Sequence, residues 1–343
     1  RGRAPLSLVT ATLADPTGYG RILREGGAVV GIREQRDCAP RELAIDEVNP
    51  GLYAIDAAFL REAMGALTTD NAQGELYLTD VVAMAAKAGG AIDVPGDMGE
   101  LRGVNDRREL ALCGEVLRRR INDALASSGV GIVDPACTYV DADAVVEPDT
   151  TIAPNVHLRG RCVVRSGAII DVGCVLQDVE VDAGAHLLPY TVAADSRVGP
   201  SAHVGPFTHL RPATVLHEGA KVGNFCETKK TIVGKDSKVN HLSYVGDGVL
   251  GEGVNVGAGT IFCNYDGFQK HTTVLDDGAF IGSDSQIVAP VRVGKGAYVA
   301  SGSTVTRDVP DDALAMSRTK QVNKEGYASR LKARFAFSKK SST

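Results

Sequence analysis

Several features are scarce or missing in this chain, and each absence narrows what the protein can be. The 343 residues contain no Trp but 39 Gly, a balance that suits short strands joined by tight corners. There is no run of eighteen apolar residues and no signal-peptide pattern, so nothing in the sequence points to a membrane or to export. A net charge of −5 argues against a general role in binding nucleic acid.

Cysteine usage predicts a reducing compartment. Seven cysteines are an odd number, and none has CxxC spacing, which favours free thiols in a cytoplasm. We expect Cys162 and Cys174 to be buried packing residues, because both occupy the small-residue position of a repeat. The length is sufficient for two domains. The chain begins with Arg1 rather than Met, and we expect it to be part of a longer protein.

A six-residue period dominates the second part of the sequence. The apolar positions of this repeat are Val140, Val146, Ile152, Leu158, Val164, Ile170 and Leu176, then Val192, Val198, Val204, Leu210, Leu216 and Val222, then Ile281, Ile287, Val293, Val299 and Val305. A period of six fits neither a helix nor a free strand, but it is the signature of a parallel β-helix. We predict a prism of roughly 9–10 coils from about Ile132 to Val309, with one apolar side chain per side on its axis.

The same repeat carries two kinds of small residue, one directly after the apolar position and one two positions before it, such as Ala202 and Ser237. A Gly often follows the apolar position, as in Val198-Gly199, Val204-Gly205, Val222-Gly223, Ile281-Gly282 and Val293-Gly294. We interpret these glycines as corner residues whose backbone a Cβ would strain. The repeat is interrupted from Phe262 to about Thr272 by a polar stretch, which we expect to project as a loop.

The first part of the chain has no such period and predicts a mixed α/β fold. Leu6–Thr10 and Ala28–Ile32 have the apolar runs of strands. Ala57–Leu67 and Leu78–Ala86 have helical spacing, the second with Thr79-Asp80 as a cap. A further amphipathic helix is expected from Asp106 to Ser127, between the two parts. Its apolar stripe is Leu110, Cys113, Leu117, Ile121 and Leu125.

These patterns divide the chain into four regions. Residues 1–105 form a partial α/β domain, 106–129 a linker helix, 130–309 the β-helix and 310–343 a basic C-terminal arm. The arm carries eight Lys or Arg residues from Arg318 onward against Glu325 alone. Two interpretations stay open for it: a solvated tail, or a segment whose first part reaches an anionic ligand.

Candidate site residues are those that break the repeat, because a solenoid is mostly scaffold. Arg211, Lys229 and Lys230 are cations placed among the coils, and Arg with Lys suits a phosphate group. His241 is a candidate general base, since a neutral imidazole accepts a proton near pH 7. Glu227 is either a partner that orients His241 or an ordinary surface carboxylate.

Zinc is a weaker alternative. His203 and His209 are one hexad apart, which would place them on adjacent sides of one coil. No third His lies at comparable spacing, whereas a zinc site needs three or four ligands.

The sequence around these candidates resembles the bacterial GlmU family over almost the whole chain. In the second part the matching segments are Arg211-Pro212, Val222–Lys230, Asn240–Asp247, Asn255–Ile261, Cys263–Gly267 and Gly282–Ser285. In the first part they are Asp15–Arg21, Glu34, Glu47–Asn49, Asn71–Glu75 and Gly103–Asn105. The resemblance implies a left-handed parallel β-helix, preceded by a partial α/β nucleotidyltransferase domain and a linker helix.

The resemblance also implies an activity. The β-helix would transfer acetyl from acetyl-CoA to the amine of glucosamine 1-phosphate, a step toward UDP-N-acetylglucosamine for the cell wall. His241 matches the general base, and a homotrimer would build each site between neighbouring prisms. Substrate-binding positions match Arg211, Lys229, Tyr244 and Asn255, with Glu227 as a further possibility. Acetyl-CoA contacts match Ala258, Asn264, Tyr265, Ser283, Ser301 and Arg318, with Lys270 as a further contact from the loop.

The family's second activity transfers UMP from UTP to N-acetylglucosamine 1-phosphate. In this chain Gly20, Glu34 and Asn49 match sugar-binding positions, and Asn105 matches one magnesium ligand. The Gly-rich loop that wraps the nucleotide phosphates and the Asp that holds the magnesium are not in the sequence given. We therefore expect this polypeptide to transfer acetyl but not UMP.

Two rival functions remain open from the sequence. In one, the chain is another sugar-1-phosphate nucleotidyltransferase whose β-helix only assembles the oligomer. In the other, the prism is a structural trimer without activity. The group of His241, Tyr244, Asn255 and the Asn264-Tyr265 loop argues against both.

Overall fold

The computed structural model describes residues 4–101, 103–104 and 106–340, and it divides into two compact units. One unit extends to Leu117 and the second begins at Arg118, so that the long helix α4 (Arg107–Ser127) belongs to both. Each unit has a core of its own. None of the helices in these described ranges combines the length and the apolar character that a membrane crossing requires.

The first unit is a six-stranded mixed sheet with short helices, as the α/β prediction requires. Its strand order is β4-β2-β3-β6-β1-β5, and β4 also pairs with β1. The strands are β1 (Leu6–Thr12), β2 (Gly20–Glu25), β3 (Ala28–Arg33), β4 (Glu47–Asn49), β5 (Tyr53–Ile55) and β6 (Ala91–Pro95). The helices are η1 (Gln35–Asp37), α1 (Ala57–Met64), α2 (Asp80–Ala88) and α3 (Met98–Leu101).

Sequence periodicity located two strands and two helices of this unit, and one predicted cap makes no capping hydrogen bond. The predicted strands and helices correspond to β1, β3, α1 and α2. Thr79 stands at the N-cap position of α2, yet its side chain makes no cap hydrogen bond. Its hydroxyl instead donates to the carboxylate of Glu34 (3.0 Å). The Thr79 hydroxyl therefore holds Glu34, which directly follows β3, instead of capping α2.

Helix α4 begins as the sequence predicted, and its last turns pack on the prism. The carboxylate of Asp106 accepts a hydrogen bond from the Glu109 amide (2.8 Å), which satisfies one free donor of the first turn. Ile121 and Leu125 pack against the prism core. Buried Asn122 donates to the carbonyls of Pro135 and Thr138, so α4 is tied to the first coil by hydrogen bonds as well as by apolar contact. A short 3-10 turn, η2 (Pro135–Cys137), lies in that coil.

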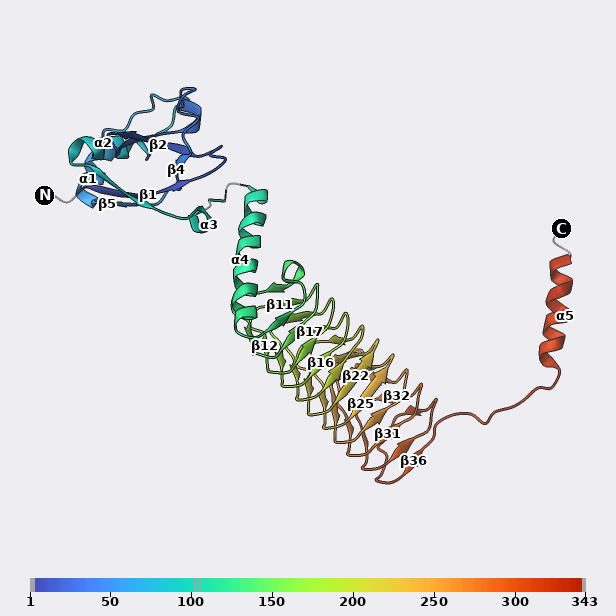
Figure 1. Ribbon diagram of the computed structural model, residues 1–343. Helices are drawn as coiled ribbons and strands as arrows, with labels where there is room; N and C mark the ends of the chain where they lie inside the picture. The colour runs from blue at the N-terminus through green and yellow to red at the C-terminus, as the bar shows by residue number, and fades with distance from the viewer. Residues whose placement is uncertain (1–3, 102, 105, 341–343) are drawn as a thin grey trace. The chain divides into compact units, whose positions relative to one another are not determined.

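The second unit confirms the predicted parallel β-helix. Three parallel sheets form its sides, with 11, 10 and 9 strands in the part of the chain described, and successive coils stack strand on strand (Figure 1). The 11-stranded sheet contains β7 (Gly131–Ile132), β10 (Thr151–Ile152), β13 (Ile169–Ile170), β16 (His186–Leu187), β19 (His203–Val204), β22 (Lys221–Asn224), β25 (Lys238–His241), β28 (Asn255–Val256), β31 (Phe280–Ile281), β34 (Tyr298–Val299) and β36 (Leu314–Ala315).

The other two sheets continue each coil. The 10-stranded sheet contains β8 (Tyr139–Val140), β11 (His157–Arg159), β14 (Val175–Gln177), β17 (Val192–Ala194), β20 (His209–Leu210), β23 (Glu227–Lys229), β26 (Tyr244–Gly246), β29 (Ile261–Cys263), β32 (Gln286–Val288) and β35 (Thr304–Val305). The 9-stranded sheet contains β9 (Val145–Val146), β12 (Val163–Val164), β15 (Glu180–Val181), β18 (Arg197–Val198), β21 (Val215–Leu216), β24 (Ile232–Val233), β27 (Gly248–Leu250), β30 (Thr273–Leu275) and β33 (Val291–Val293).

The prism axis is filled by the residues of the six-residue period, with two corrections. Val192 was predicted on the axis but is 41% exposed, and its neighbour Ala193 is buried instead. The strand alternates sides at every residue, so a shift of one position exchanges the inward and outward side chains. Phe262 was predicted to begin a projecting loop but is one of the largest fully buried side chains. The loop therefore begins at Asn264, after β29.

The five glycines predicted as corner residues serve close approach more than corner geometry. Of the five predicted corner glycines, only Gly205 has a φ in the left-handed region (102°). At Gly223 a Cβ would instead collide with the carbonyl of Asn240 in the next coil. The left-handed corner positions are often non-Gly residues, among them Phe225 (57°) and Leu242 (51°). Glycine is thus needed where the backbones of two coils come close together.

Most small-residue positions are buried, and where they hold Ser, Thr or Cys most side chains hydrogen-bond to a backbone carbonyl. The Ser237 hydroxyl donates to the carbonyl of Gly251 (2.7 Å), and that of Thr231 donates to Val245 (2.9 Å). Cys162 and Cys174 are buried, which confirms their prediction as packing residues, and burial raises the pKa of each thiol. These groups satisfy buried carbonyls and bind one coil to the next.

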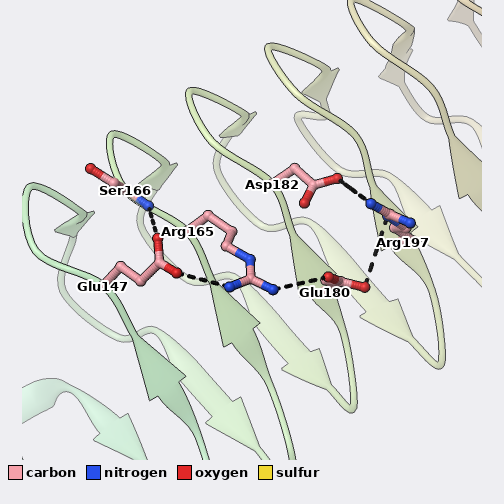
Figure 2. A network of polar contacts seen from close by, with 6 residues as sticks. All are labelled: Glu147, Arg165, Ser166, Glu180, Asp182 and Arg197. Carbon is pink, nitrogen blue, oxygen red and sulfur yellow. Dashed lines mark hydrogen bonds and ion pairs between the residues drawn. The ribbon is translucent and has the colours of Figure 1, made fainter.

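A ladder of charged side chains crosses four coils on the 9-stranded sheet (Figure 2). Arg165 lies between Glu147 (2.9 Å) and Glu180 (3.5 Å), and Arg197 contacts Glu180 (3.8 Å) and Asp182 (3.1 Å). The Arg165 and Arg197 side chains are 44% and 55% exposed, so solvent screens the network. Its role is to order charges on the sheet surface, with a small contribution to stability.

Beyond the last apolar position the chain adds one further strand and a helix. Strand β36 pairs with β34, so the prism continues past Val309. The basic arm then contains α5 (Tyr327–Lys340). The described side chains of this helix are mostly exposed, including Phe335 at 65%.

Candidate functional site

The strongest candidate for chemistry lies at the corner between the 11-stranded and 10-stranded sheets. His241 ends β25 and Asn224 ends β22, and the two residues are in register. Nδ1 of His241 is 2.9 Å from Oδ1 of Asn224. An amide oxygen only accepts hydrogen bonds, so Nδ1 carries the proton and Nε2 carries the free lone pair. Because His241 is exposed, this lone pair is available to a ligand.

Glu227 does not orient the imidazole in this structure. Its carboxylate accepts a hydrogen bond from the Arg211 guanidinium at 2.7 Å. The partner of His241 is Asn224, so the expected role belongs to a different residue. Glu227 instead holds Arg211 on the surface of the 10-stranded sheet.

Cations gather on that same sheet. Lys229 ends β23, and its pKa is lowered from the usual range, chiefly by the side chain of Lys270 and then by burial and by the charges of Arg211 and Lys230. Lys270 comes from the loop after β29, more than forty residues later in the sequence. Lys229, Lys230 and Lys270 thus lie near Arg211, which is itself paired with Glu227, so the positive charge of this group exceeds the negative.

The loop that delivers Lys270 has internal order. The Asp266 carboxylate accepts hydrogen bonds from the amides of Phe268 and Gln269 (both 2.7 Å) and contacts Nε2 of His271 (2.7 Å). These contacts lower the pKa of Asp266 far below its usual range. An antiparallel bridge joins Tyr265 to Lys270, so the loop is a small hairpin rather than an irregular loop.

Tyr244 and Asn264 meet over Gly246. A Cβ on Gly246 would collide with the Tyr244 hydroxyl and with Nδ2 of Asn264, so only glycine lets both side chains lie there. Nδ2 of Asn264 donates to Asp247 (2.6 Å), which fixes the amide. Gly246 is also in register with Lys229. Two of the predicted ligand residues therefore lie beside the cation group.

Three predicted acetyl-CoA residues form one column that starts at His241. Backbone hydrogen bonds connect consecutive corners, from the amides of Leu242, Gly259, Asp284 and Gly302 to the carbonyls of Asn224, His241, Ala258 and Ser283 (2.7–3.1 Å). Ser301 continues the column, and the Arg318 guanidinium donates to its carbonyl (2.9 Å). At the strand spacing of about 4.8 Å, His241 to Ser301 covers about 14 Å along the prism edge.

Asn255 lies on a different face from the cation group. It begins β28 in the 11-stranded sheet, where it is in register with Lys238. Arg211, Lys229 and Tyr244 lie on or beside the 10-stranded sheet. His241 lies at the corner where the 11-stranded and 10-stranded sheets meet. Asn255 and Lys229 lie on different sheets, so the structure does not bring them together within one chain.

The predicted sugar-binding residues of the first unit lie close together. Gly20 pairs with Asn49 across β2 and β4, and a Cβ on Gly20 would lie 3.5 Å from the Glu34 carboxylate. The Asn49 side chain accepts a hydrogen bond from the Gly51 amide (3.0 Å). Asn105, the predicted magnesium ligand, lies outside the described residues.

Metal ligands do not cluster in the part of the chain described. No group of three or more His, Cys, Asp or Glu side chains with metal-site geometry occurs among those residues. His203 and His209 do lie on adjacent sides of one coil, on β19 and β20, as their spacing predicted.

Sequence reasoning missed three residues of the site. Asn224, Asp247 and Asp266 each fix a predicted residue or the loop that carries one. Asn224 precedes His241 by 17 residues, which is about one coil, so the repeat length itself is the signal that would have found it. Asp266 stands in an Asp-Gly pair, a common turn signal.

One family model and one solved structure each match part of this chain. Residues 272–307 match the family described as bacterial transferase hexapeptide (six repeats). The UDP-N-acetylglucosamine acyltransferase of Francisella novicida, a solved structure, is 17% identical over 58% of this chain and 73% of that one, with a TM-score of 0.37, too low to carry an argument.

Curated relatives match nearly the whole chain. The bifunctional protein GlmU of Sorangium cellulosum is 61% identical over 335 residues, which are 97% of this chain and 70% of the relative. The bifunctional protein GlmU of Anaeromyxobacter sp. is 52% identical over 97% of this chain and 69% of its own. That of Pelobacter propionicus is 48% identical over 96% and 72%. At this identity and coverage, the chain belongs to the GlmU family.

Proposed function

We propose that this chain transfers acetyl from acetyl-CoA to the amine of glucosamine 1-phosphate, giving N-acetylglucosamine 1-phosphate. Membership of the GlmU family supports the reaction class. The observation that carries the proposal is the His241–Asn224 pair at the start of the Ala258–Ser283–Ser301 column. A base with a free lone pair thus stands at one end of a column about 14 Å long, along which the thioester would lie.

The proposed mechanism begins with the amine. An amine attacks a thioester only as its free base, so Nε2 of His241 takes the amine proton as the new C–N bond forms. The C–S bond then breaks, and the CoA thiolate leaves and takes a proton from the His241 imidazolium, which restores the base. Donors near Ser283 would stabilise the charge that develops on the oxygen or the sulfur. Positioning both substrates supplies much of the rate, with up to ~7–11 kcal/mol available in principle.

The cation group supplies the phosphate site in this proposal. Arg211, Lys229 and Lys270 would hold the sugar phosphate, and Tyr244 and Asn264 would line the space beside it. The depressed pKa of Lys229 supports this assignment, because a bound dianion relieves the repulsion that causes the shift. A covalent acyl-enzyme has no part in the mechanism.

We infer that the active form is a homotrimer. Asn255 and Lys229 face outward on two different sides of the prism, so one small sugar cannot touch both in a single chain. A second copy whose 11-stranded sheet faces the first copy's 10-stranded sheet would bring them together. A stack of exposed rings at the same corner supports contact between copies: Tyr190, Phe207 and Phe225, with centroids 5.2 and 5.5 Å apart.

The remaining assignments follow from the family. All seven cysteines are free thiols, which supports a cytoplasmic location. Transfer of UMP, and magnesium for that site, concern the first unit, where Gly20, Glu34 and Asn49 would contact the sugar. The absence of UMP transfer by this polypeptide stays a prediction.

Thiol release from acetyl-CoA tests the proposal. The assay compares release with and without glucosamine 1-phosphate, for the unaltered chain and for His241→Ala. We expect sugar-dependent release that falls by about 10²–10⁴ in the variant, the usual contribution of a general base. Sugar-dependent thiol release of similar size in both proteins would show that His241 is not the base. If a folded trimer released no thiol in response to the sugar, the prism would be a scaffold rather than an enzyme.

A further inference from the structure

The hairpin that follows β29 places Lys270 beside Lys229. An antiparallel bridge joins Tyr265 to Lys270, and the Lys270 side chain is the largest cause of the lowered Lys229 pKa. Two ammonium groups this close repel each other. Lys229 ends β23, which is paired with a strand on either side, whereas Lys270 lies on the hairpin. Lys270 therefore keeps its place only if bonds within the hairpin hold it there.

The Asp266 carboxylate shapes the turn that precedes Lys270. Its Oδ1 accepts the amide hydrogens of Phe268 and Gln269 (both 2.7 Å), so the side chain closes the turn. Its Oδ2 is 2.7 Å from Nε2 of His271. The pKa of Asp266 is lowered first by the Gln269 amide, then by His271 and by the Phe268 amide. The carboxylate is therefore ionised and accepts hydrogen bonds at both oxygens.

His271 supplies the donor for the second carboxylate oxygen. An ionised carboxylate only accepts hydrogen bonds, so Nε2 of His271 carries the proton in this contact. The backbone amide of His271 also donates to the Asn264 carbonyl (2.8 Å), which fixes the base of the hairpin. Neighbours in the sequence thus make different contacts: Lys270 reaches Lys229, and His271 reaches Asp266.

These bonds lie within one hairpin and form in each copy of the chain. None of them needs a group from a neighbouring prism, whichever sheet that prism packs against. The two amides close the turn by themselves, and the bond from His271 adds the arm that follows Lys270. Lys270 is therefore enclosed between the two residues of the Asp266–His271 hydrogen bond.

We propose that His271 is a positioning residue of the phosphate site, which acts through Asp266 on Lys270. The proposal rests on the function proposed above, because it assigns His271 a part in binding glucosamine 1-phosphate. With the hydrogen bond in place, Lys270 stands beside Lys229 before the phosphate arrives, and binding does not have to order the hairpin. Without it, repulsion moves Lys270 away, and part of the binding free energy is used to return it.

Steady-state thiol release tests the proposal with His271→Phe and His271→Gln. Phe keeps a ring but has no donor, whereas the side-chain amide of Gln offers an N–H in place of Nε2. His271→Phe should raise KM for glucosamine 1-phosphate by about three- to tenfold, the effect of one hydrogen bond. Its kcat should change by less than about twofold, and His271→Gln should recover most of the KM. An unchanged KM in His271→Phe, or an equal rise in both variants, would overturn the proposal.

A double-mutant cycle separates positioning from a general effect on the fold. When Lys270→Gln is already present, adding His271→Phe should raise the same KM by less than about twofold, because the residue through which His271 acts is gone. The same factor with and without Lys270 would overturn the proposal. The matched control is Gln269→Ala, which removes a side chain of the hairpin but keeps the amide that bonds Asp266. A rise as large as that of His271→Phe in this control would also count against it.

Calorimetric titration with inorganic phosphate gives a second measurement that needs no acetyl transfer. His271→Phe should raise the Kd for phosphate by about the same three- to tenfold over the unaltered chain, and His271→Gln should restore it. If the unaltered chain releases no thiol, the proposed reaction fails, and the titration still decides whether His271 holds Lys270. A phosphate Kd that is the same in His271→Phe and the unaltered chain would overturn the positioning role.

Discussion

Removing the hydrogen-bond partner of His241 is the most direct test of how the site is built. Oδ1 of Asn224 accepts the Nδ1 proton at 2.9 Å and leaves the lone pair on Nε2. In Asn224→Ala the imidazole loses this partner, so it samples both tautomers and more orientations. The ring itself and its neighbours on β25 stay in place, which separates this change from the loss of the base.

The size of the effect follows from the bond that is lost. A neutral hydrogen bond contributes about 0.5–1.5 kcal/mol net. Applied to the transition state, that lowers kcat by about 2- to 13-fold, since 1.36 kcal/mol corresponds to a factor of ten. The loss should be far smaller than the roughly 10²–10⁴ expected for His241→Ala. Because Asn224 is assigned to the base and not to a substrate, KM for both substrates should change little.

Asn224→Asp is the matched variant for this prediction. A carboxylate keeps the acceptor but favours the protonated imidazole, so the acid limb of the pH–rate profile should move to higher pH while the plateau activity recovers. The assay is thiol release from acetyl-CoA at saturating sugar phosphate between about pH 5 and 9. The reasoning is refuted if Asn224→Ala keeps full kcat, or if Asn224→Asp leaves the acid limb where it was.

Three further predictions concern the loop, the core and the surface. Lys270→Gln should raise KM for the sugar phosphate. Because it also removes the main cause of the lowered Lys229 pKa, sugar-phosphate binding should persist to higher pH. An unshifted basic limb in the pH dependence of kcat/KM would contradict this. Leu210→Ala, fully buried on the axis, should destabilise the prism by about 2–5 kcal/mol in denaturant unfolding, whereas Val192→Ala should cost under about 0.5; equal losses would disprove the corrected register. Arg165→Met should leave the midpoint of denaturant unfolding nearly unchanged, with a still smaller change in high salt; a clear drop in the midpoint that salt does not reduce would make the charged ladder structural.

Much of the fold follows from local pattern alone. Whether a residue points inward in a hexapeptide coil depends on the residues next to it, so the period identified the β-helix and most of its axis. The start of α4 at Asp106 is also a local signal, but of its predicted apolar stripe only Ile121 and Leu125 pack against the prism core, and Leu110 and Leu117 are exposed. The identity of His241, Lys229 and Tyr244 as site candidates came from their departure from that period and from a family resemblance.

The partners of those residues were decided only by the stacking of coils. Coil lengths vary, so one residue more or less in a corner changes which side chains become neighbours in the next coil. Asn224 lies beside His241 because they are 17 residues apart, and Arg211 reaches Glu227 because they are 16 apart. The exchange of Val192 for Ala193 on the axis has the same origin. A six-residue repeat fixes the direction of each side chain, while the register between coils, summed over every corner and loop, fixes its contacts.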